Sequence, residues 1–93
     1  MSKEEITVRL QNILRKRFGM DLKGKWQEVK NYPLLGYKLG IGPGQLLYLF
    51  FDIEEEFNIR IPENSIVNGD FHSLDSIAGI IADEYKGNDD ERL

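Results

Sequence analysis

The chain has 93 residues, of which 41% are apolar and 30% are charged, with a formal net charge of −4. This composition is typical of one small folded domain and argues against a disordered chain. The absence of cysteine excludes disulfides, thiol catalysis and thiolate metal sites, and a single histidine cannot form a histidine pair around zinc. The polar N-terminus does not resemble a signal peptide, and no apolar run reaches the length of a membrane span. We therefore expect a cytoplasmic monomer without a metal site.

The charge is unevenly distributed along the chain. Residues 1–40 hold nine Lys and Arg against four Asp and Glu, a net of +5, whereas residues 41–93 hold three against twelve, a net of −9. The acidic half favours a protein partner with a basic surface, because complementary fields steer association. The low pI of about 4.9 disfavours nucleic acid as that partner. A small helical nucleic-acid-binding domain remains an alternative, in which the cations would be Arg15, Lys16, Arg17, Lys23 and Lys25.

The first predicted helix covers residues 3–18. Ser2 and Glu5 have the spacing of a capping box, and Gly19 stands where a C-terminal cap belongs. Its apolar stripe consists of Ile6, Leu10, Ile13, Leu14 and Phe18. Residues 19–44 then form a long connection rich in turn residues, with a short helical turn expected over residues 25–30.

The second helix is predicted over residues 45–57. At 100° per residue its core face consists of Leu46, Leu49, Phe50, Ile53 and Phe57. Leu47, Tyr48 and Phe51 fall on the opposite side, beside Glu54 and Glu55. Two interpretations fit this outer strip: Trp26 and Tyr32 of the long connection cover it, or it is a surface for a partner.

The remaining chain predicts a short helix and a long one. Pro62 suits the first turn of a short helix that ends near Val67, and Ser73 is placed to cap a final helix. That helix has a core stripe of Leu74, Ile77, Ile80, Ile81 and Tyr85. We expect an all-α bundle of three principal helices plus one short helix in residues 1–85, followed by a flexible acidic tail in residues 86–93.

The segment Ile53-Glu-Glu-Glu-Phe-Asn-Ile-Arg-Ile-Pro62 closely resembles a segment of the acyl carrier proteins. In that family an acidic Leu-Glu-Glu-Glu-Phe stretch ends the second helix and leads into an Ile-X-Ile-Pro loop. The resemblance extends to the order of the predicted helices over about residues 3–85, and it implies an acyl-carrier-protein-like bundle. It also implies partners among carrier-using or peptide-modifying enzymes, with bacterial peptide maturation as one setting.

The attachment motif of that family is degenerate in this chain. Family members carry 4′-phosphopantetheine on the serine of an Asp-Ser-Leu motif at the start of the second helix. An ungapped alignment from Phe57 places this motif on Gly42, Pro43 and Gly44. Proline has no hydroxyl, so the resemblance implies a carrier fold without its covalent cofactor.

Two serines leave a different carrier hypothesis open. Ser73-Leu-Asp-Ser76 looks like an attachment motif, which would make the chain a functional acyl or peptidyl carrier with a displaced serine. The competing interpretation is that Ser73 is a helix N-cap.

The resemblance also predicts a docking face. Partners of carrier proteins dock on the second helix, and the corresponding residues here are Gln45, Leu47, Tyr48, Phe51, Glu54 and Glu55. Tyr48 stands where many family members have an acid, so this face is less acidic and more aromatic than is usual in the family. We therefore expect a dedicated protein partner with a basic, partly apolar surface, in which an apolar socket has a basic rim. No serine or cysteine stands in a nucleophile setting, so we expect an interaction module and not an enzyme.

Overall fold

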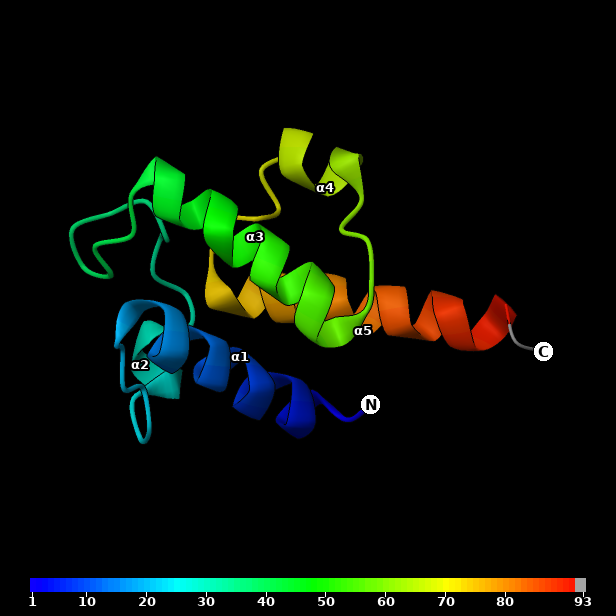
Figure 1. The fold of residues 1–93 in the computed structure, drawn as a ribbon, viewed down its shortest axis with the longest axis horizontal. Helices are drawn as coiled ribbons and strands as arrows, with labels where there is room; N and C mark the ends of the chain where they lie inside the picture. The colour runs from blue at the N-terminus through cyan, green and yellow to red at the C-terminus, as the bar shows by residue number, and fades with distance from the viewer. Residues whose placement is uncertain (92–93) are drawn as a thin grey trace.

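The computed structural model describes the backbone of residues 1–91 and the side chains of residues 1–85, and the helices of this part of the chain are joined by turns and loops without any strand. It contains five helices, α1 (Lys3–Phe18), α2 (Trp26–Val29), α3 (Pro43–Phe57), α4 (Glu63–Val67) and α5 (Leu74–Glu91) (Figure 1). Three of them are long and two are single short turns. The predicted all-α class is therefore confirmed, and α2 lies within residues 25–30, where a short helical turn is predicted.

Helix α1 begins and ends where its caps predict. Ser2 Oγ accepts a hydrogen bond from the Glu5 N–H at 3.1 Å, and Gly19 adopts a left-handed conformation with φ of 69°. The Gly19 N–H donates to the Arg15 carbonyl at 2.9 Å, which satisfies one of the free carbonyls of the last turn. The buried stripe of α1 packs against both α3 and α5.

The long connection between α1 and α3 is held by its own apolar residues. Leu22, Leu34 and Ile41 are buried in the same core as the long helices. Two backbone hydrogen bonds join this connection to the start of α5, from the Leu34 N–H to His72 O at 2.8 Å and from the Asp75 N–H to Lys30 O at 2.9 Å. The connection is thereby part of the folded core.

Helix α3 starts at Pro43, two residues before the predicted start. Proline suits the first helical position because its φ is fixed and its missing N–H would have no partner there. Gln45 Oε1 accepts the Gly42 N–H at 2.9 Å, which holds the entry to the helix. Asn58, with φ of 51°, ends α3 in the left-handed conformation.

The core face of α3 is narrower than the prediction. Leu49, Ile53 and Phe57 are buried, but Leu46 in the first turn and Phe50 are only partly buried. The Phe50 ring contacts Phe51 and Phe71 edge to face, with ring centroids 5.6 Å and 5.9 Å apart. Phe50 lies at the border between the core and the outer face. Of the five predicted core residues, it is the furthest around the helix axis from the middle of the buried face.

The two C-terminal helices lie close to their predicted positions. Helix α4 begins at Glu63, directly after Pro62, and α5 begins at Leu74, directly after Ser73. The helical backbone of α5 continues to Glu91, whereas the sequence analysis expects a flexible tail from residue 86. The last two residues of that tail lie outside the described part of the chain, and its flexibility stays a prediction.

The unequal burial of the two phenylalanines predicts unequal costs of truncation. Phe57→Ala should destabilise the domain by about 3–5 kcal/mol, since it removes a fully buried ring. Phe50→Ala should cost roughly 2 kcal/mol, because part of its ring is already in water. Urea unfolding followed by circular dichroism measures both values, and equal costs would show that Phe50 is a core residue after all.

Candidate functional site: the outer face of α3

The outer face of α3, defined here as Leu47, Tyr48, Phe51 and Glu55, is exposed to solvent. Leu47 and Tyr48 are each 56% exposed and Phe51 is 55% exposed, while Leu49 is completely buried. Leu47 and Phe51 are four residues apart, so their side chains lie one above the other on the helix. The structure thus places three large apolar or aromatic residues side by side on one surface.

The loop residues Trp26 and Tyr32 do not cover this face. Trp26 lies in a hollow with Val8 and Lys30, beside the start of α5. The ammonium group of Lys38 lies over the Tyr32 ring, 4.4 Å from the ring centroid. The interpretation that these two aromatic residues bury the outer strip of α3 is therefore wrong.

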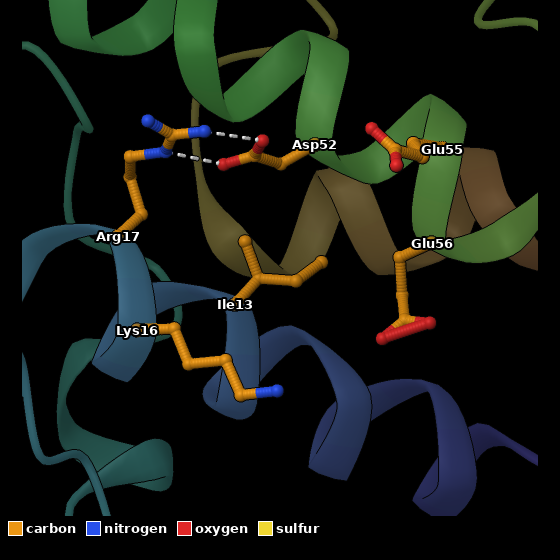
Figure 2. A pocket seen from close by; sticks show the side chains of 6 residues that line it. All are labelled: Ile13, Lys16, Arg17, Asp52, Glu55 and Glu56. Carbon is orange, nitrogen blue, oxygen red and sulfur yellow. Dashed lines mark hydrogen bonds and ion pairs between the residues drawn. The ribbon is translucent and has the colours of Figure 1, made fainter.

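An arginine of α1 holds one edge of the outer face. Arg17 binds Asp52 with both carboxylate oxygens engaged, through Nε to Oδ2 at 2.7 Å and Nη2 to Oδ1 at 2.8 Å (Figure 2). The same guanidinium lies 5.2 Å from the centroid of the Tyr48 ring. The hydrogen bond to Asp52 raises the pKa of Arg17 above its ordinary value. The pair joins α1 to α3 and leaves the guanidinium of Arg17 beside the Tyr48 ring.

A second arginine makes a similar contact nearer the end of α3. Arg9 Nη2 donates to Glu56 Oε2 at 2.9 Å and to the Glu56 backbone carbonyl at 2.7 Å. Its guanidinium also lies 4.8 Å from the centroid of the Phe57 ring. The hydrogen bond to Glu56 raises the pKa of Arg9. Sequence reasoning missed both arginine contacts, because the partners are 35 and 47 residues apart in the chain.

The pair of Arg17 and Asp52 borders an open cleft of about 480 Å³ between α1 and α3, and Glu56 also lines this cleft. Ile13, which is buried, forms part of its wall, and Lys16 from α1 and Glu55 from α3 lie on opposite sides of it (Figure 2). Neither Lys16 nor Glu55 has an ion pair within the described residues. The cleft is charged on both sides, so it differs from the apolar outer face beside it.

The predicted docking residues Glu54 and Gln45 both have partners within the chain. Glu54 is half-buried, and its Oε2 accepts the Ile61 N–H at 2.9 Å. This contact fastens the Ile-Arg-Ile-Pro segment to the end of α3. Gln45 holds the Gly42 N–H, as described above. Leu47, Tyr48, Phe51 and Glu55 are therefore the predicted site residues that are free to meet a partner.

The degenerate attachment motif lies at the first turn of α3. Pro43 and Gly44 are exposed, and Gly42 immediately precedes the helix. Pro43 occupies the position at which the resemblance would place a serine, three residues before Leu46 and on the same helix as the outer face. The motif thus has the exposure that an attachment site needs but not the nucleophile.

The serines of the alternative motif are engaged with each other. Ser73 Oγ accepts the Ser76 N–H at 3.2 Å, and Ser76 Oγ accepts the Ser73 N–H at 3.1 Å. Ser73 is only 3% exposed. These reciprocal bonds form a cap at the start of α5, which confirms the interpretation of Ser73 as an N-cap.

Four of the five cations of the nucleic-acid hypothesis line two different hollows. Lys16 and Arg17 face the cleft towards α3, where Arg17 is paired with Asp52. Arg15 and Lys23 line a different hollow together with Asp21. An acidic residue thus lies beside the cations in both places.

Comparison with protein-family models, with curated proteins and with solved structures gives no match. None of the helices in the described part of the chain combines the length and the apolar character needed to cross a membrane. The described residues also contain no cluster of three His, Asp or Glu side chains suited to holding a metal ion.

The exposure of the outer face predicts that its residues contribute little to folding. Phe51→Ala and Leu47→Ala should each change the free energy of unfolding by less than about 1 kcal/mol, since surface substitutions rarely cost more. Ile53→Ala is the matched control, and its cost should be about 2–5 kcal/mol because Ile53 is completely buried. A loss of several kcal/mol in Phe51→Ala would instead show that Phe51 belongs to the core.

Proposed function

We propose that this chain is an acyl-carrier-protein-like interaction module that is not phosphopantetheinylated. It docks reversibly through the outer face of α3 on a carrier-using or peptide-modifying enzyme. The observation that carries this proposal is the juxtaposition of two features on one helix. Three exposed apolar or aromatic side chains follow closely after Pro43, the residue that stands in place of the attachment serine.

The order and lengths of the helices support the carrier-like part of the proposal. A long first helix, a long anchored connection, a second helix, a short helix and a final long helix follow one another as the resemblance implies (Figure 1). The Ile-Arg-Ile-Pro segment after α3 buries Ile59 and Ile61 and is fastened by Glu54. Its similarity to the family's loop is therefore matched by a structural role.

Two alternatives receive less support from the structure. A functional carrier with a displaced serine would need Ser73 or Ser76 to reach the active site of a transferase, but Ser73 is buried and both hydroxyls are hydrogen-bonded within the cap. A nucleic-acid-binding domain would need its cations on one face. Here Arg17 is paired with Asp52, and Arg15 lies in a different hollow.

The absence of a hydroxyl at position 43 predicts a null result in a direct assay. Incubation with coenzyme A and a broad-specificity phosphopantetheinyl transferase should leave the intact mass unchanged. A gain of one phosphopantetheine group on any serine would refute the proposal that the module is cofactor-free.

A matched variant controls for transferase recognition. Gly42→Asp, Pro43→Ser and Gly44→Leu together restore the attachment motif at the start of α3. Modification of this variant at position 43, but not of the parent, would support the alignment. Failure of both proteins to react would show that the resemblance does not extend to recognition by the transferase.

The docking face is tested by site-specific photo-crosslinking in the cells that produce the protein. p-Benzoylphenylalanine at position 51 should form a covalent adduct with a partner protein, because the side chain lies at the centre of the proposed face. The same probe in place of Glu28, an exposed residue of α2, is the control. Equal labelling from both positions, or none from position 51, would contradict docking through α3.

A further inference from the structure

We infer that the partner of the outer face of α3 is a protein with a concave apolar groove and one cation beside it, and not a protein with an extended basic surface. This inference rests on the proposed function and specifies the partner's chemistry. It narrows the apolar socket with a basic rim that the sequence predicts to an apolar groove with a single cation beside it.

The acidic residues of α3 are mostly engaged within the chain. The helix has four carboxylates, of which Asp52 binds Arg17 and Glu56 binds Arg9. Glu54 is half-buried and accepts the Ile61 N–H. Glu55 is exposed and has no hydrogen-bond or ion-pair partner within the described residues. One carboxylate of the four is therefore free to meet a cation of a partner.

The two aromatic residues of the outer face already make contacts within the chain. The guanidinium of Arg17 lies against one side of the Tyr48 ring, and the Phe51 ring contacts Phe50 edge to face. Side chains that are already ordered lose less entropy when they are buried by a partner. Large and well-ordered aromatic residues are also the side chains that contribute most at protein interfaces.

The shape of the surface determines the shape of its partner. Leu47 and Phe51, four residues apart, form a ridge along a convex helix, as in complexes where a helix lies in an apolar groove. Glu55 continues the row one turn further along. Charge complementarity then places one cation of the partner at the end of the groove that meets Glu55.

The test uses the protein that crosslinks to p-benzoylphenylalanine at position 51, purified and titrated by calorimetry with the unmodified chain. Phe51→Ala should raise the dissociation constant of the complex about 30-fold or more, as expected for the loss of an apolar anchor. Glu55→Gln should raise the dissociation constant about threefold, since one exposed ion pair is lost. Glu54→Gln should raise it less than about twofold, because the amide oxygen of the introduced glutamine still accepts the Ile61 N–H. Raising NaCl from about 50 to about 500 mM should weaken binding less than about fivefold, since one exposed ion pair is screened.

Arg17→Gln distinguishes the apolar groove from a basic surface most sharply. The variant leaves the Asp52 carboxylate without its ion pair and removes the cation that lies beside the Tyr48 ring. A basic partner would then bind more tightly, whereas a partner with an apolar groove should bind several-fold more weakly. Val67→Ala, which alters an exposed apolar residue of α4, controls for nonspecific changes, and thermal unfolding of every variant confirms that it is folded.

The outcomes separate this inference from the proposed function. Tighter binding by Arg17→Gln, or weakening of more than about 100-fold in high salt, would overturn the apolar groove while docking through α3 still stands. No adduct at position 51, or an affinity unchanged by Phe51→Ala, would overturn both.

Discussion

The antiparallel packing of α1 against α3 is the constraint on which the surface of this molecule depends. Ile13 of α1 is buried between the two helices, and Arg17 and Arg9 bind Asp52 and Glu56 on either side of it. Exposed ion pairs stabilise a fold little. The rotation of α3 about its axis is therefore set mainly by the burial of Leu49, Ile53 and Phe57, and the two ion pairs form at the edges of that contact. That rotation buries one side of α3 and leaves its apolar outer side in water.

Local signals explain why the sequence predicts the helices well. The Ser2 cap and Gly19 define α1 through contacts within four residues, and the bonds between Ser73 and Ser76 define the start of α5 in the same way. The start of α3 is less accessible to such reasoning. Pro43 lies among glycines and suggests a turn, although a proline at the first helical position is equally favourable.

The candidate site is predictable only in part. Its apolar strip follows from the periodicity of one helix, whereas the pairing of its acidic residues depends on how the helices pack together. The periodicity of α3 is sufficient to place Leu47 and Phe51 on its outer side. The engagement of Asp52 and Glu56 depends on which helix packs beside them, and no local pattern specifies that. Of the two acids that the sequence predicts to dock, Glu54 accepts the Ile61 N–H, which no local pattern indicates, and only Glu55 is without a partner in the described residues. The exposure of the outer strip could not be predicted either, because it depends on where Trp26 of the long connection packs.

The proposed function gives the chain no covalent arm, and this changes what the outer face has to supply. A carrier with a tethered substrate gains affinity from the arm that enters its enzyme, whereas under the proposed function the present chain binds through its surface alone. Complete burial of an exposed large apolar side chain is worth about 1.5–3 kcal/mol, and those of the outer face are already about half buried, so together they supply roughly 2–5 kcal/mol. Association itself costs about 4 kcal/mol or more. A partner that binds more tightly than micromolar must therefore also make contacts outside the outer face of α3.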